Sequence, residues 1–263
     1  MSIKKVLIGG AVALGMSTNA MALNLGGVIF DPSSLFDWTS NSQLIEDLLD
    51  PGVDGVFDLP GAASADDVVN TLNGFGKVTG INNTFQADFC PTCELTYEFG
   101  GFKVASVVAS GTDTLLGFTG GWINFKVDSA TAYNGDDKSS ATDGASWLEL
   151  TAHETFSATH GLFTSINATL NSFGAGTDAG VGAGLLDVSG GLAMANFDTD
   201  TQTDGADLVF STSFQPIPGG AQGDDLELFG TADFRGDSIP EPSSIALIGL
   251  GLLGFSAARR RKS

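Results

Sequence analysis

The feature that most constrains the fold is an alternation of apolar and polar residues that begins near Thr84. A period of two places successive side chains on opposite faces of an extended strand, which a helix cannot do. The pattern returns several times, in residues 95–99, 122–128, 208–214 and 226–234. We therefore predict a mainly β chain that folds as an antiparallel β-sandwich or barrel.

Glycine doublets separate several of these segments and predict turns, at Gly100-Gly101, Gly120-Gly121, Gly190-Gly191 and Gly219-Gly220. Glycine is abundant, at 36 of 263 residues, yet 42% of the chain is hydrophobic and phenylalanine occurs 19 times. A chain with this much apolar surface can bury a core, so a disordered low-complexity protein is excluded.

Two short helices are predicted ahead of the β-rich part. In residues 42–50, apolar residues recur four apart and Asp50-Pro51-Gly52 would end the helix. In residues 64–74, Ser64 would cap the first turn and Gly74 would end the last. Both apolar faces are typical of packing surfaces.

The N-terminus has the three parts of a secretory signal peptide. Lys4 and Lys5 form a basic region, residues 6–16 an apolar core, and Ala20-Met21-Ala22 a small-x-small cleavage site. We therefore expect residues 1–22 to be recognised by the Sec export machinery and removed after Ala22.

The C-terminus also has three parts in a fixed order. Pro240-Glu241-Pro242 favours an extended backbone, and the uncharged run 243–258 would form a single membrane-spanning helix of roughly 24 Å. A basic cluster then follows, made of Arg259, Arg260, Arg261 and Lys262. Basic residues after an apolar span stay in the cytoplasm, which places the preceding chain across the membrane.

Residues 239–263 resemble the sorting tail of the PEP-CTERM family of exported bacterial proteins. The resemblance implies that an exosortase, a membrane-embedded cysteine peptidase of bacteria that make extracellular polysaccharide, recognises and removes the tail. It implies transient anchoring in the cytoplasmic membrane, then delivery to the cell surface or extracellular matrix, and it implies no activity. The alternative is a plain membrane anchor that nothing processes.

Between these ends lies one acidic exported domain, residues 23–238. Six of the eleven lysines and arginines but only one of the 31 acids, Glu241, lie in the two ends. The exported part therefore has five basic and 30 acidic residues, a formal charge of −25. Such a charge repels phosphate, so nucleic acid is excluded as a partner, while divalent cations, neutral glycans and cationic surfaces remain candidates. A general role of the acids in solubility is the simpler explanation.

Cys90-Pro-Thr-Cys93 allows three interpretations. A disulfide that stiffens the entry to the strand after Glu94 is favoured, because paired cysteines of exported proteins usually bond. A redox site is disfavoured, because such sites lie at a helix N-terminus and here a strand pattern follows. A zinc site would need His153 and His160, whose separation does not fit the usual ligand spacing.

Residues 198–207, Asp-Thr-Asp-Thr-Gln-Thr-Asp-Gly-Ala-Asp, suggest a calcium loop. Alternating oxygen-bearing side chains before a glycine turn can gather the ligands of a hard cation, here Asp198, Asp200, Gln202 and Asp204. Ser211 stands where an EF-hand needs glutamate, so that motif is excluded. The alternative is a solvated acidic loop. Thr199, Thr201 and Thr203 alternate as threonines do on ice-binding surfaces, which repeat this pattern in several rows. A single row cannot match an ice lattice, so ice binding is disfavoured.

The sequence contains no recognisable catalytic constellation. His153-Glu154 begins like a zinc-peptidase helix, but Ser157 replaces the second histidine. Trp122, Trp147 and Tyr97 could stack on sugar rings, although an aromatic residue in an alternating strand is more often part of the core.

The leading hypothesis is a non-enzymatic protein of the cell surface or extracellular matrix, structural or adhesive, with glycan or calcium as candidate ligands. The alternative is a secreted hydrolase that acts on polysaccharide.

Overall fold

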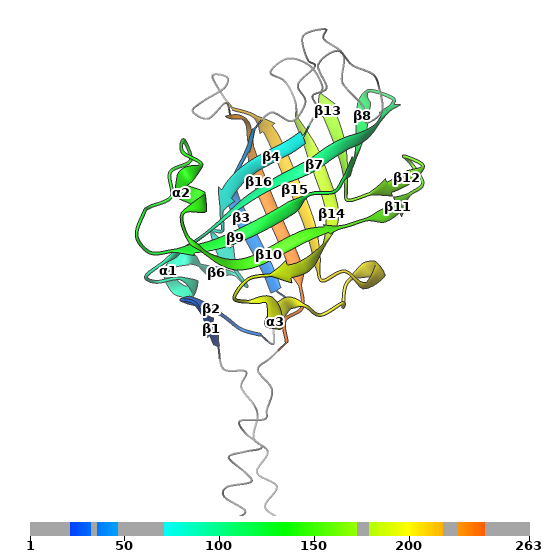
Figure 1. Cartoon of the computed structure of the whole chain (residues 1–263). Coiled ribbons are helices and arrows are strands. Elements are labelled where there is room, and N and C mark those ends of the chain that lie inside the picture. Colours follow the sequence, from blue (N-terminus) through cyan, green and yellow to red (C-terminus); the bar gives the residue numbers. More distant parts are fainter. Residues whose placement is uncertain (1–21, 33–35, 47–70, 173–178, 218–225, 240–263) are drawn as a thin grey trace, which may run out of the picture.

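The computed structural model describes residues 22–32, 36–46, 71–172, 179–217 and 226–239 (Figure 1). Residues 1–21 of the predicted signal peptide, the Pro-Glu-Pro motif, the predicted tail helix and the basic cluster lie outside these ranges. None of the helices in the described ranges has the length and apolar character needed to cross a membrane.

Strands dominate the described residues, and the helices are single turns. The strands are β1 (Leu23–Leu25), β2 (Val28–Phe30), β3 (Phe36–Glu46), β4 (Thr71–Lys77), β5 (Gly80–Ile81), β6 (Thr84–Phe85), β7 (Glu94–Ser110), β8 (Asp113–Thr119), β9 (Trp122–Asp128), β10 (Ala145–His153), β11 (Thr155–Ser157), β12 (Leu162–Thr164), β13 (Ile166–Ser172), β14 (Ala179–Gly190), β15 (Leu208–Pro216) and β16 (Leu226–Gly236). The helices are α1 (Gln86–Phe89), α2 (Ser139–Thr142), α3 (Met194–Phe197) and the 3₁₀ turn η1 (Thr203–Gly205). All pairings are antiparallel, so the prediction of a mainly β antiparallel chain is confirmed.

The main sheet closes on itself. Pairing runs from β7 through β8, β13, β14, β15, β16, β3 and β4, and β4 pairs with β7 again. Two long strands change partner along one edge: β7 pairs first with β9 and then with β8, and β14 pairs first with β13 and then with β10. Because every strand of this circuit has a neighbour on each side, it leaves few open backbone groups at a sheet edge.

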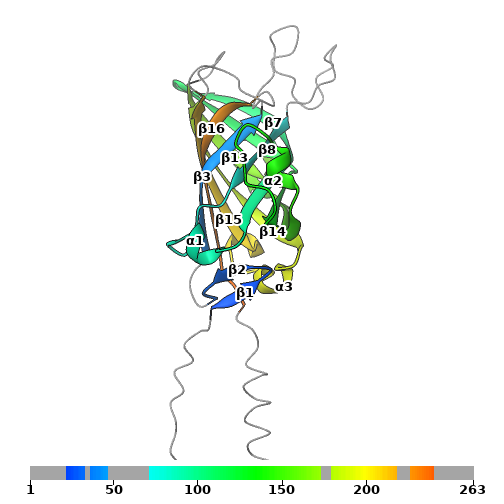
Figure 2. The same ribbon diagram turned by 90° about the vertical axis from the view of Figure 1, so that its left-hand side faces the viewer.

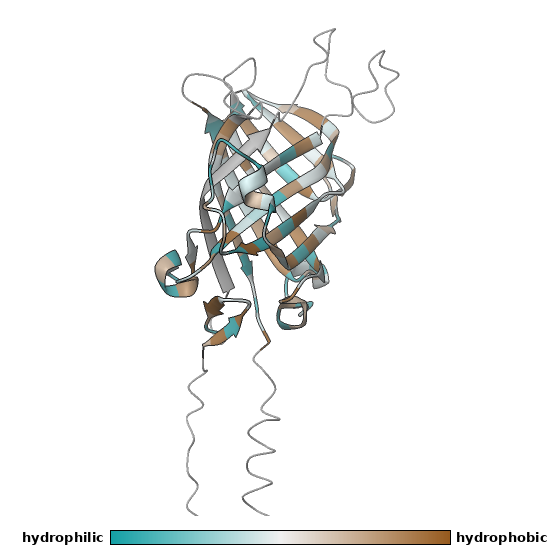
Figure 3. Ribbon diagram, turned by 60° about the vertical axis from the view of Figure 1, so that its left-hand side comes forward, coloured by the Kyte–Doolittle hydropathy of each residue, from teal (hydrophilic) through white to brown (hydrophobic). Residues whose placement is uncertain are grey.

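The inner face of the closed sheet is filled by side chains. Apolar residues alternate with polar ones along the strands (Figure 3). Phe234 lies at the centre, with ring centroids 5.1 Å from those of Phe125 and Phe210 and 5.8 Å from that of Tyr97. A cavity in this interior, lined by apolar residues that include Leu72, Phe102 and Phe210, measures only about 20 Å³. That volume is too small for an organic ligand.

One end of the closed sheet is covered by the β1–β2 hairpin and α3, which lie side by side in Figures 1 and 2. Trp147 joins them to the sheet: its Nε1 donates a hydrogen bond to the Leu25 carbonyl at 2.9 Å. Its ring centroid lies 5.7 Å from that of Phe197 and 6.4 Å from that of Phe30. These buried rings fix the β1–β2 hairpin and α3 to the same end of the sheet.

The two predicted helices are wrong within the described residues. Residues 42–46 belong to β3, where Leu44 pairs with Phe75 on one side and Phe229 on the other, and residues 71–74 belong to β4. Residues 47–70, which hold the rest of both predictions, lie outside the described ranges. Strand pairing on both edges of β3 outweighs a local apolar spacing that would also suit a helix.

The prediction of a turn at Gly100-Gly101 is also wrong, because β7 runs through both residues. At this point β7 exchanges its partner β9 for β8, and Gly101 has a φ of 73°. A glycine is needed there because other residues rarely adopt positive φ. Gly120-Gly121 does form the predicted turn, between β8 and β9.

Candidate functional site

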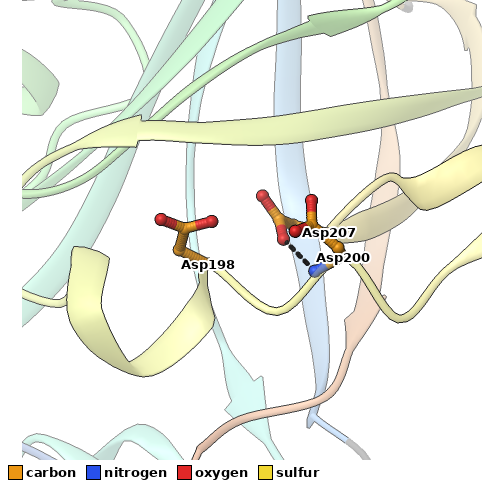
Figure 4. A group of neighbouring side chains, drawn as sticks. All are labelled: Asp198, Asp200 and Asp207. Atoms are coloured by element: carbon orange, nitrogen blue, oxygen red, sulfur yellow. Dashed lines mark hydrogen bonds between the residues drawn. The ribbon is translucent and has the colours of Figure 1, made fainter.

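Three carboxylates come together in the loop after α3. Carboxylate oxygens of Asp198, Asp200 and Asp207 all lie within 4.8 Å of one another (Figure 4). Asp198 ends α3, Asp200 has a φ of 52°, and Asp207 lies directly before β15. Asp198 and Asp200 are exposed, whereas Asp207 is only 2% exposed.

Asp207 organises this loop through its hydrogen bonds. Its Oδ1 accepts from the backbone N–H groups of Thr199 (2.6 Å) and Asp200 (2.7 Å), and its Oδ2 accepts from that of Val188 (2.7 Å). A carboxylate that receives three N–H groups is well solvated by the protein although it is buried. The loop is therefore held to β14 by the protein's own groups.

The structure brings together two of the four predicted calcium ligands. Gln202 instead directly precedes the turn η1, and Asp204, with a φ of 58°, lies within this turn. Asp207, which we did not predict as a ligand, takes their place in the group. A hard cation at this point would have the exposed oxygens of Asp198 and Asp200 available, far fewer than the six to eight that calcium takes. Calcium binding remains a prediction.

Cys90 and Cys93 lie within disulfide-bonding distance of each other. Cys90 ends α1, with its backbone N–H donating to the Gln86 carbonyl at 2.8 Å. The Gln86 side chain donates in turn to the Cys93 carbonyl at 3.1 Å. Both cysteines are buried at the C-terminal side of a helix turn, away from the helix N-terminus, which is one of the positions that lower the pKa of reactive thiols. The pair lies at the entry to β7, where the predicted disulfide would stiffen the chain, and its structural role remains a prediction.

An open pocket of about 480 Å³ lies beside the Cys90–Cys93 loop and is lined on its other side by residues 128–132. Its acidic groups are engaged. Glu94 binds Lys77 at 2.5 Å and accepts from the Tyr133 N–H at 2.7 Å, and Asp128 accepts from Ala130 and Thr131. Burial raises the pKa of Glu94, but these hydrogen bonds and the charge of Lys77 outweigh it and hold the pKa below its usual range.

The two histidines lie apart from the cysteines. His153 Nδ1 pairs with Asp187 across β10 and β14 at 2.8 Å, and His160 Nδ1 bonds the Ser106 hydroxyl at 3.0 Å. Burial lowers the pKa of His160, so the neutral ring is favoured. Within the described ranges, the three-aspartate group is the sole cluster of potential metal ligands, so the cysteines and histidines do not form a zinc site.

Two of the three aromatic residues considered for sugar stacking are core residues. Trp147 and Tyr97 are fully buried, and Trp122 packs over Gly100 and Gly101. No pattern in the sequence distinguished the exposed aromatic residues, which in the described ranges are Phe85, Phe156 and Phe163. Phe156 and Phe163 face each other on the β11–β12 hairpin, with ring centroids 5.7 Å apart. Such a hairpin is too short for its strand period to be distinguished in the sequence.

The C-terminal end of the chain is similar to a known protein-sorting signal. Residues 238–262 match the family model of the PEP-CTERM protein-sorting motif. The resemblance recognised in the sequence is thereby confirmed, and it supports an exported protein whose membrane-anchored sorting signal is recognised by an exosortase-type membrane protein. No curated protein and no solved structure matches this chain.

Proposed function

We propose that the protein is exported, held briefly at the outer face of the cytoplasmic membrane by its tail, and delivered by an exosortase-type peptidase to the cell surface or extracellular matrix. There it serves as a non-enzymatic structural or adhesive component. The observation that carries this proposal is the match of residues 238–262 to the sorting motif.

The proposal divides the chain into three parts. Residues 1–22 are the signal peptide that the Sec machinery cleaves after Ala22, residues 23–238 the cargo, and residues 239–263 the sorting tail. Within the tail, Pro240-Glu241-Pro242 is the motif that the peptidase reads, the run 243–258 spans the membrane as a helix, and the cluster 259–262 stays in the cytoplasm.

Features of the described domain support a structural role. Its interior is packed, and its buried carboxylate Asp207 accepts hydrogen bonds from backbone N–H groups. His153 and His160 form hydrogen bonds with side chains of other strands, those of Asp187 and Ser106. The strongly acidic surface favours neutral or cationic partners, which include uncharged extracellular polysaccharide and calcium at Asp198 and Asp200.

The proposal is tested by following the C-terminus of the protein in the cell that produces it. Mass spectrometry of surface and culture fractions should find a chain that has lost the residues beyond the motif. A Glu241→Ala variant should accumulate in the membrane fraction with Ser263 still present. The matched control is Glu227→Ala, an acidic residue of β16 outside the tail, which should be processed normally. An exported wild-type chain that still ends at Ser263 would contradict the proposal.

The role after delivery is tested with the processed protein and the polysaccharide of the producing cell. Retention of the protein on the polysaccharide without release of shorter sugars supports an adhesive or structural role. Release of shorter sugars supports the alternative, a secreted hydrolase.

A further inference from the structure

The fold holds the chain up to the residue before the sorting motif. The Ile239 N–H donates to the Asn196 carbonyl at 2.8 Å, and the Asn196 side-chain amide donates to the Ile239 carbonyl at 3.3 Å. The Ser238 hydroxyl donates to the Pro32 carbonyl at 3.2 Å. No spacer therefore separates the folded domain from Pro240.

This attachment limits how far the domain can lie from the membrane. Three residues, 240–242, separate Ile239 from the start of the uncharged run at Ser243. Because an extended residue spans at most about 3.6 Å, the two points are no more than about 15 Å apart. Any peptidase that binds Pro240-Glu241-Pro242 therefore meets the end of the domain that carries α3 and the β1–β2 hairpin.

That end is unusually apolar for the surface of this domain. Three of the seven large hydrophobic side chains exposed in the described residues belong to it, namely Leu192 (58% exposed), Met194 (39%) and Ile239 (43%). Leu192 lies against the β1–β2 turn, since a Cβ atom added to Gly26 would be 2.8 Å from its Cδ2. Met194 begins α3, which also contains the Asn196 that holds Ile239.

We propose that this end of the domain, formed by the β1–β2 turn, Leu192, α3 and Ile239, is a docking surface for the exosortase-type peptidase. The inference rests on the proposed function. Exposed Asp198 and Asp200 follow α3 directly, and carboxylates are poorly suited to an anionic lipid surface. A protein partner can offer both an apolar contact for Leu192 and Met194 and cationic groups for the aspartates.

The test is the rate of tail removal in producing cells, measured by pulse labelling of the full-length precursor. The double variant Leu192→Ser/Met194→Ser should be processed about fivefold more slowly or worse, the scale on which moderately important interface side chains act. The matched control is Phe156→Ser/Phe163→Ser, which removes two exposed hydrophobic residues from the β11–β12 hairpin and should be processed at the wild-type rate.

A second variant guards against a folding defect. Met194→Gln keeps the size and helix propensity of an exposed side chain, so it should fold normally and still slow processing by about twofold. Thermal unfolding of each exported variant verifies that the fold is intact. Wild-type rates for both the double variant and Met194→Gln would overturn the inference.

Repeating the assay in detergent distinguishes the peptidase from the bilayer. With purified precursor and solubilised peptidase, the difference between the wild type and the double variant should persist. If it disappears, the surface contacts lipid and the inference is wrong. A wild-type precursor that is never cleaved in cells would instead remove the proposed function, which makes the two failures distinguishable.

Discussion

Replacement of Asp207 by asparagine should destabilise the domain more than any change in the exposed acids around it. Asp207 is 2% exposed and its two carboxylate oxygens accept three backbone N–H groups. In Asp207→Asn, one oxygen can still accept from Thr199 and Asp200. The new amide NH₂ then faces the N–H of Val188, and two donors cannot bond each other.

The magnitude follows from these contacts. Hydrogen bonds to a charged group contribute about 1.5–3 kcal/mol each, and a buried donor left without a partner costs about 1–3 kcal/mol. One bond is lost outright and the other two lose the assistance of the charge, so we expect a loss of about 2–4 kcal/mol in the free energy of unfolding. For a domain of this size, that lowers the Tm by about 4–16 °C.

Thermal and urea unfolding of the exported protein, followed by circular dichroism, measures this loss. The matched control is Asp204→Asn, an exposed residue of η1 whose φ of 58° asparagine also tolerates. The control should change the free energy of unfolding by less than about 0.5 kcal/mol. Equal effects of the two substitutions, or an Asp207→Asn variant as stable as the wild type, would refute the assigned role of Asp207.

Three further predictions concern the crosslink, the pH dependence and the cation. Cys93→Ser should lower the Tm in non-reducing buffer, and an unchanged Tm would exclude a structural disulfide. Because the pKa of Glu94 is lowered by folding, its carboxylate stabilises the domain above the unfolded pKa of about 4.3, and this contribution is lost as the pH falls through the lower folded value. Unfolding measured between about pH 5 and pH 3 should therefore be less pH-dependent in Lys77→Met than in the wild type. Calcium should raise the Tm and a chelator should lower it, and Asp198→Asn/Asp200→Asn should abolish both effects. An unchanged Tm of the wild type with calcium and with chelator would contradict calcium binding.

The strand content was predictable because alternation is a local property. The apolar faces of 122–128 and 208–214 can be read from neighbouring residues, and both segments are strands. The error at 42–46 has the opposite cause. The spacing of Leu44 and Leu48 fits a helix. The conformation of residues 42–46 is instead decided by the pairing of Leu44 with Phe75 and Phe229, which are distant in sequence.

The aspartate group shows a similar limit. Alternating acids in 198–204 indicated a cation loop, and the structure brings two of them, Asp198 and Asp200, together with Asp207. Which acid lies inside depends on Val188, whose N–H reaches Asp207 from another strand. No spacing within the stretch specifies that contact, so Asp207 could not be distinguished from its exposed neighbours.

The positions of the two ends of the domain connect the fold to its delivery. Ala22 and Ile239 are the first and last described residues, and both lie at the end covered by the β1–β2 hairpin and α3 (Figure 1). A domain whose termini leave from one end turns that same end toward the membrane whether the signal peptide or the tail holds it. Under the proposed function, the domain need not reorient between the two cleavages, and its opposite end and the outer face of the sheet stay directed away from the membrane.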